Sequence, residues 1–167
     1  VSAAGNPLLF FTANITSSGP TTAVTTMEQA LLARIEGATT SIDAAIYGFD
    51  RTAVRDALLA AAGRGVTVRV VTDDESYAAD PYYADLEAAG ITVVDDGRSS
   101  IMHNKFFVID EEVVWTGSTN ITDNGFSYNH NNSLVFTSTL LADIYGVEFT
   151  EMFVGGDFGT QKTDNVT

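Results

Sequence analysis

Residues 103–120 read HNKFFVIDEEVVWTGSTN, and they carry more structural and chemical information than any other part of the chain. Their pattern is H-x-K-x4-D-x6-G-S-x-N, in which six residue types stand at fixed spacings. The fixed residues are His103, Lys105, Asp110, Gly117, Ser118 and Asn120. Each of them alone is most often an ordinary core, turn or surface residue, but a match of this length is specific. The window therefore anchors the predictions of both fold and function.

Two successive strands are predicted inside this window. Residues 106–109 are β-branched or aromatic and include no Gly or Pro, which indicates a buried strand. His103 and Lys105 are separated by one residue, so on a strand their side chains point to the same face. Together they suit a phosphate, because an ammonium neutralises its oxygens and an imidazole can attack phosphorus or donate a proton. The returning strand, 113–116, ends at the turn 117–120, whose hydroxyl, amide and backbone N–H groups can hold an oxyanion.

This pattern resembles the HKD signature of the phospholipase D superfamily. The resemblance implies that His103 is the nucleophile or the acid, and that a phosphohistidine forms which water or an alcohol then resolves. It implies that Lys105 and Asn120 bind phosphate oxygens, that Ser118 supports the histidine and the phosphate, and that Asp110 belongs to the catalytic motif as a structural and orienting residue. The mechanism requires no metal and no cofactor. The sequence agrees, since it has no Cys, only two His, and no spacing typical of zinc ligands.

One position departs from the family pattern. Nuclease-like members often carry a Glu about fourteen residues after the Gly of the G-S-x-N turn, where it orients the histidine. That position here is Asn131. An amide can accept a hydrogen bond from imidazole but cannot stabilise imidazolium as a carboxylate does, so the rate and pH profile are affected. The neighbouring His130 is interpreted as a loop histidine, with a substrate-side role as the alternative.

The motif occurs once in the chain, whereas the active site of the family is built from two copies. Two solutions follow. The first is a symmetric homodimer in which His103 of each subunit faces one phosphate at the two-fold axis. The second is a further HKD lobe, with this chain as one half of a bilobal protein. In both solutions the partner supplies a second copy of the motif. The expected substrate is a phosphodiester, either nucleic acid or phospholipid.

Outside the window, strand and helix patterns alternate. Strands are predicted at residues 8–11, 41–49, 66–72 and 91–94, and helices at 25–37, from 51 to 63, at 81–89 and at 140–152. Such alternation predicts an α/β fold with a central mixed, largely parallel β-sheet flanked by helices on both faces, and the resemblance implies the α-β-α sandwich of phospholipase D and related nucleases. We expect one domain over residues 1–167, with a core at about 8–155 and a polar tail or linker at 156–167.

The net charge of −14 and the pI near 4.1 fit poorly with a non-specific nucleic-acid binder, which normally presents a basic face. Either acidic residues cover the surface away from a positive cleft, or the substrate is not a long polyanion. No run approaches 18 apolar residues, so no transmembrane segment is predicted. The chain begins with Val-Ser-Ala-Ala-Gly rather than Met, and we expect a secreted or periplasmic protein over a cytoplasmic one.

The sequence thus predicts a metal-independent phosphodiesterase, most simply a nuclease-like hydrolase. The alternatives are a phospholipase D acting on phosphatidyl head groups, and an inactive or partner-dependent lobe of a two-motif enzyme.

The acidic runs 73–75 and 95–96 are interpreted as loop and strand-end residues rather than as metal ligands.

Overall fold

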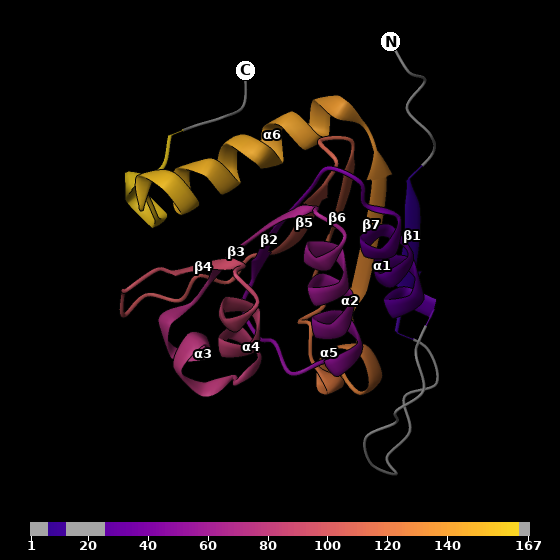
Figure 1. Ribbon diagram of the computed structural model, residues 1–167, viewed down its shortest axis with the longest axis horizontal. Coiled ribbons are helices and arrows are strands. Elements are labelled where there is room, and N and C mark those ends of the chain that lie inside the picture. The colour runs from indigo at the N-terminus through magenta and orange to yellow at the C-terminus, as the bar shows by residue number, and fades with distance from the viewer. Residues whose placement is uncertain (1–6, 13–25, 164–167) are drawn as a thin grey trace.

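The computed structural model describes residues 7–12 and 26–163, and these form a seven-stranded sheet with helices packed against it (Figure 1). The strand order is β1-β7-β6-β5-β2-β3-β4. The strands are β1 (Leu8–Phe11), β2 (Ser41–Ile46), β3 (Thr67–Thr72), β4 (Thr92–Asp95), β5 (Lys105–Ile109), β6 (Val113–Gly117) and β7 (Asn132–Thr137). The helices are α1 (Thr26–Gly37), α2 (Thr52–Gly63), α3 (Asp74–Ala79), α4 (Tyr82–Ala88), α5 (Asp123–Ser127) and α6 (Thr139–Thr150), followed by η1 (Glu151–Gly155) and η2 (Gly159–Gln161).

The sheet is mixed, as predicted, but parallel pairing is confined to one side of it. Strands β2, β3 and β4 pair in parallel, whereas the other four pairings are antiparallel. The expectation of a largely parallel sheet is therefore wrong in its proportions. Connection length explains part of this difference: β2, β3 and β4 are joined by helical crossovers, but only three residues separate β5 from β6, and so short a connection permits only an antiparallel hairpin.

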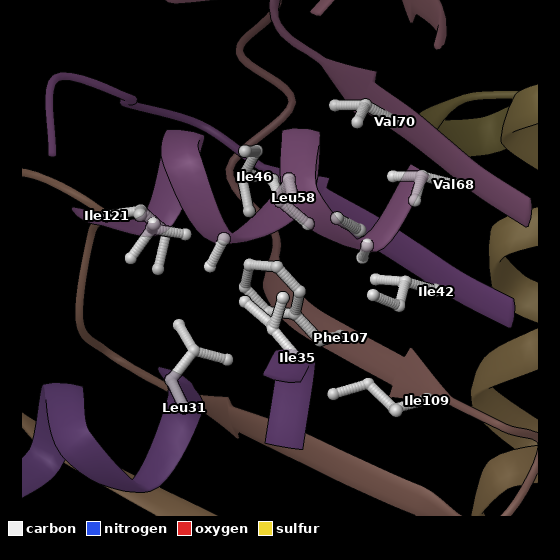
Figure 2. Close-up of a cluster of buried hydrophobic side chains, with 14 of the residues drawn as sticks. Leu31, Ile35, Ile42, Ile46, Leu58, Val68, Val70, Phe107, Ile109 and Ile121 are labelled. Atoms are coloured by element: carbon white, nitrogen blue, oxygen red, sulfur yellow. The ribbon is translucent and has the colours of Figure 1, made fainter. Parts of the chain in front are cut away.

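Helices cover both faces of the sheet, which confirms that part of the prediction. The larger core lies between the sheet and helices α1, α2 and α4, and Figure 2 shows side chains from α1, α2, β2, β3 and β5 meeting there. Alternate residues of the strands point into it, as the two-residue period of a strand requires. A buried ion pair reinforces this layer, because Arg51 donates to both carboxylate oxygens of Glu28 at 2.7 and 2.8 Å.

The opposite face is covered by α6 and η1, and Figure 1 shows α6 lying apart from α1 and α2. The second core contains Phe106 and Val108 of β5 together with Phe149 and Met152. Phe158 is also buried there, so the predicted polar tail at 156–167 packs against the body as far as the structure describes it. No helix within residues 7–12 and 26–163 has the length and apolar character needed to cross a membrane.

Two short helices were not predicted. Residues 73–75 were expected in a loop, but Asp73 caps α3 by accepting hydrogen bonds from the amides of Glu75 and Ser76. Helix α5 begins after Thr122, whose hydroxyl accepts from the amide of Gly125. Both helices follow the ends of strands that terminate at the same edge of the sheet, and that edge carries the motif.

Candidate active site

The sheet topology brings the two ends of the motif together. Because β5 is antiparallel to both β2 and β6, its beginning lies beside their ends, with Lys105 opposite Ile46 and Phe106 opposite Thr116. His103 and Lys105 therefore lie at the same edge as the turn that follows β6. The dipeptide Tyr47-Gly48, which follows β2, lies between these two parts of the motif.

The Tyr47 ring contacts both predicted phosphate-binding side chains at the start of β5. It meets the His103 ring edge-on with the centroids 4.8 Å apart, and the Lys105 ammonium lies 5.3 Å from its centroid. Lys105 is buried, and its Nζ donates a hydrogen bond to the carbonyl oxygen of His103 at 2.7 Å. No carboxylate of the described residues pairs with this ammonium. Its charge is thus held in place while remaining available to an anion.

Desolvation lowers the pKa values of both Lys105 and His103. Burial lowers the pKa of Lys105 to about 8, so the ammonium persists at neutral pH but loses its proton more readily than an ordinary lysine. The His103 side chain is exposed, but its neighbours remove part of its hydration, and this partial desolvation lowers its pKa; the Lys105 charge lowers it further, and Asp73 acts in the opposite direction. A histidine with a lowered pKa is largely neutral near pH 7, which is the form that can act as a nucleophile.

On the other side of Tyr47-Gly48 lies Asn120, the last residue of the motif. Its Oδ1 is buried and accepts no hydrogen bond from the part of the chain that the structure describes. A Cβ on Gly125 would stand 2.0 Å from the Asn120 carbonyl oxygen, so only glycine lets α5 approach the turn so closely. Gly117 has a similar role, because its φ is 155° and a Cβ there would meet the Asn132 carbonyl oxygen at 2.2 Å. The close approach of these two glycines therefore holds the turn that carries Asn120 rigidly at the edge.

The side chains of Ser118 and Asn131 are hydrogen-bonded to each other. The Ser118 hydroxyl donates to Asn131 Oδ1 at 2.9 Å and accepts from the Asn132 amide, and Asn131 Nδ2 donates to the Gly125 carbonyl at 2.9 Å. Asn131 thus braces the turn, and no hydrogen bond is recorded between it and His103. His130 is exposed and makes no hydrogen bond or ring contact with the other described residues.

Asp110 does not lie with the other motif residues. It follows directly after β5, whose first residue is Lys105, so the length of the strand places the two residues roughly 16 Å apart. Its carboxylate accepts hydrogen bonds from the backbone amides of Thr39, Thr40 and Ser41 and from the Thr39 hydroxyl. It fastens the loop between α1 and β2 to the β5–β6 turn, which fits the structural and orienting role that the resemblance implies, and a part in catalysis stays a prediction.

Asp73 is a further site residue that the sequence did not single out. It is almost fully buried, and one carboxylate oxygen accepts the Met102 amide at 3.0 Å, which positions the segment leading to His103. Asp73, Asp74 and Asp96 each place a carboxylate oxygen within 4.8 Å of the others, an arrangement of hard oxygen donors that suits Mg²⁺ or Ca²⁺. Asp73 and Asp96 already accept backbone amides, and the expectation of metal-independent chemistry stays a prediction.

Two clefts flank the motif. One, of about 270 Å³, is lined by His103, Arg98, Ser100 and Lys162 among others, with an apolar wall. The second, of about 430 Å³, is lined by Tyr47 and Asn120 and by acidic and amide side chains. A larger groove of about 690 Å³ lies under α6 and contains none of the motif residues.

Comparison with known proteins agrees with this geometry. Residues 31–153 match the family model described as cardiolipin synthase, PLD-like domain. The chain therefore belongs to the phospholipase D superfamily. Mitochondrial cardiolipin hydrolase of Xenopus laevis is 36% identical over 124 residues, which cover 74% of this chain and 59% of that protein. The human protein of the same name is 32% identical over 124 residues, covering 74% of this chain and 49% of its own length. This chain thus spans about half the length of these relatives.

Solved structures share the fold. Nuc from Salmonella typhimurium, a phospholipase D family member, superposes with a TM-score of 0.75 at 24% identity, covering 89% of this chain and 93% of Nuc. NucT from Helicobacter pylori gives a TM-score of 0.73 at 22% identity, covering 87% of this chain and 94% of NucT. The predicted phospholipase D and nuclease-like architecture is confirmed by these two structures.

Proposed function

We propose that this protein is a phosphodiesterase that works through a covalent phosphohistidine on His103. The observation that carries the proposal is the juxtaposition at one edge of an unpaired imidazole, a buried ammonium without a carboxylate partner among the described residues, and Asn120, whose Nδ2 can donate to a phosphate oxygen. A ring nitrogen of His103 attacks phosphorus, and the bond from phosphorus to the leaving alcohol oxygen breaks. Lys105 and Asn120 stabilise the charge on the non-bridging oxygens. Water then attacks the phosphohistidine, which releases the phosphate monoester and regenerates His103.

The leaving oxygen needs a proton, and we propose that it comes from His103 of a second copy. The chain has two histidines, and the other, His130, makes no recorded contact with the His103 ring. His103 is exposed, and neither ring nitrogen has a hydrogen-bond partner among the described residues, so the imidazole can face another subunit. A symmetric dimer would supply the nucleophile from one chain and the acid from the other at a single shared site. A second lobe of a longer protein is the alternative source.

We propose nucleic acid as the substrate, in keeping with a nuclease-like hydrolase. The support is Arg98, whose guanidinium shares a cleft with His103 in a protein that is otherwise strongly acidic. A phospholipid is the second candidate, because Ile101, two residues before His103, is 60% exposed and could contact an acyl or glycerol group. The relatives named mitochondrial cardiolipin hydrolase support that candidate as well.

Subunit mixing tests the shared site. Wild-type protein is mixed with His103→Ala protein, allowed to exchange subunits, and assayed on a chromogenic phosphodiester in the presence of EDTA. If each site needs two copies of His103, an equal mixture retains about a quarter of the activity of the same total amount of wild-type protein. Independent sites would retain about half, which would contradict the dimeric mechanism. Light scattering on the same samples gives the oligomeric state.

Substrate class is tested with single-stranded DNA and with vesicles containing cardiolipin, each with wild-type and His103→Ala protein. We expect cleavage of DNA by wild-type protein and a loss of at least about a thousandfold in the variant. Cleavage of cardiolipin alone would select the phospholipid candidate. Full activity of the His103→Ala variant on either substrate would overturn the covalent mechanism.

A further inference from the structure

Arg98 differs from three of the other arginines because no carboxylate of the described residues binds its guanidinium, and it differs from Arg34, which also lacks an ion pair, because it lines the cleft that contains His103. Arg51, Arg55 and Arg69 each form ion pairs with neighbouring carboxylates. The half-buried guanidinium of Arg98 forms no ion pair within residues 7–12 and 26–163. In a chain with 22 acidic and 8 basic residues, an unpaired arginine in a cleft that also contains His103 requires an explanation.

The backbone of Gly159 positions this guanidinium. Gly159 has a φ of +58°, and a Cβ built on it would lie 3.1 and 3.2 Å from the two terminal nitrogens of Arg98. The guanidinium therefore lies directly against the glycine, where an added methyl group would displace it. Contact with a neutral backbone fixes the side chain without neutralising its charge. A positioned, unneutralised guanidinium is the group that proteins use to bind phosphate through paired N–H donors.

The other charges in the same cleft are already engaged. Lys162 forms an ion pair with Glu148 and donates to its carbonyl oxygen. Asp96 is buried and accepts the amide of Asp74. Arg98, with the nearby Ser100 hydroxyl, is thus the group in this cleft that is free to meet an anion.

The cleft on the other side of the motif has the opposite character. It is lined by Asp50, Glu75 and Asp80 and by the amides of Asn124 and Asn129. Burial raises the pKa of Asp50, and the neighbouring Asp123 and Asp80 charges act in the same direction. A second phosphate would be repelled there, whereas hydroxyl groups or a base edge would find hydrogen-bond partners. The site therefore distinguishes the two sides of the scissile phosphate.

We propose that Arg98 binds the phosphate adjacent to the scissile phosphodiester in a single-stranded nucleic acid. The inference rests on the proposed phosphodiesterase function and specifies its substrate. A nucleic-acid strand carries a phosphate at every nucleotide, so a strand whose scissile phosphate lies at His103 brings a neighbouring phosphate beside it. Arg98 accepts that phosphate on one side, and the acidic cleft receives the nucleoside on the other. Arg98 is a binding and specificity residue, and it takes no part in the chemical step.

Matched dinucleotides test this assignment. The substrates are thymidylyl-thymidine and the same dinucleotide carrying an added phosphate at its 5′ or its 3′ end. For the wild-type protein we expect kcat/KM to rise by about tenfold to a hundredfold with the added phosphate at one of the two ends. Arg98→Gln should reduce that ratio to about one, and Arg98→Lys should restore part of it, since lysine keeps the charge but not the paired donors. Arg34→Gln is the control, because Arg34 is also half-buried without a recorded ion pair but lies on α1, outside this cleft.

A second variant, Gly159→Ala, should produce the same selective loss by displacing the guanidinium. If Arg98→Gln leaves the ratio unchanged, or lowers kcat/KM equally for all three dinucleotides, the inference is wrong while the phosphodiesterase function stands. If wild-type protein gives a ratio near one but cleaves cardiolipin in preference to phosphatidylglycerol, and Arg98→Gln removes that preference, the second phosphate belongs to a lipid and the nucleic-acid assignment is overturned. Failure of the wild-type protein to cleave any phosphodiester would instead refute the proposed function itself.

Discussion

Replacing Asp110 with Ala should destabilise the protein without removing its chemistry. Asp110 is a fixed residue of the motif, but it lies at the end of β5 away from His103 and receives four hydrogen bonds from Thr39, Thr40 and Ser41. A hydrogen bond to a charged group contributes about 1.5–3 kcal/mol. Water replaces part of this at a half-exposed carboxylate, so we expect a loss of about 2–4 kcal/mol in the free energy of unfolding.

That loss corresponds to a fall in melting temperature of roughly 4–16 °C for a chain of this length. The measurements are urea unfolding, calorimetry, and the turnover number per folded molecule. Glu111→Ala is the matched control, because Glu111 occupies the same turn with a similar φ of 55° but makes no recorded hydrogen bond. We expect the control to change stability by less than about 1 kcal/mol.

The pH dependence of the free energy of unfolding gives an independent test of the role of Asp110. Burial raises the pKa of Asp110, but the amides of Ser41, Thr39 and Thr40 together outweigh it and lower the pKa below its ordinary value. Its contribution is therefore fully present above about pH 4 and is lost as the pH falls through the folded-state pKa. A stable Asp110→Ala protein whose turnover number has collapsed would show instead that Asp110 takes part in the chemical step.

Three further substitutions test the site. Lys105→Met should abolish activity yet raise the free energy of unfolding at pH 7 by about 1–3 kcal/mol in denaturant titrations, because the pKa of the buried lysine is lowered to about 8. Between about pH 8 and 10.5 the folded wild type loses the Lys105 proton, so its free energy of unfolding should rise to that of the variant. Gly125→Ala should cost about a hundredfold in kcat, because its Cβ would stand 2.0 Å from the backbone oxygen of Asn120 in the proposed phosphate-binding turn, whereas a Cβ at Gly146 would meet nothing within 4 Å and Gly146→Ala should leave kcat unchanged. Asp73→Asn should shift the acid limb of the pH–rate profile to lower pH, because the carboxylate raises the pKa of His103; an unshifted limb would exclude that electrostatic role.

Much of the architecture follows from local patterns. The β-branched and aromatic run at 106–109 forms the buried strand β5, and the helices at 25–37 and 81–89 begin and end within two residues of the prediction. These elements are long or strongly periodic, so local preference and burial agree. The proportion of parallel strands was overestimated, because strand direction depends on which strands pair, and β5 inserts beside β2 rather than beside β4.

The site is only partly encoded in the motif. The spacing of His103, Lys105 and Asn120 predicts that they act together, and the antiparallel pairing of β5 and β6 brings their strand ends to one edge. The roles of Tyr47 and Asp73 depend on which strands end at that edge, and strand order cannot be read from one sequence. The same holds for the Arg51–Glu28 pair, whose partners lie 23 residues apart. The partners of Asp110 at Thr39, Thr40 and Ser41 could not be predicted either, because a motif gives spacing along the chain and not distance in space.

The most direct test of the account is to trap the covalent intermediate. Wild-type protein is mixed with a chromogenic phosphodiester, quenched in alkali within milliseconds so that a phosphoramidate survives, digested and analysed by mass spectrometry. We expect a substrate-derived phosphoryl group on the peptide that contains His103, formed as fast as the first product and absent from the His103→Ala protein. Rapid product formation without any adduct on that peptide would contradict it, since it would mean that water attacks phosphorus directly.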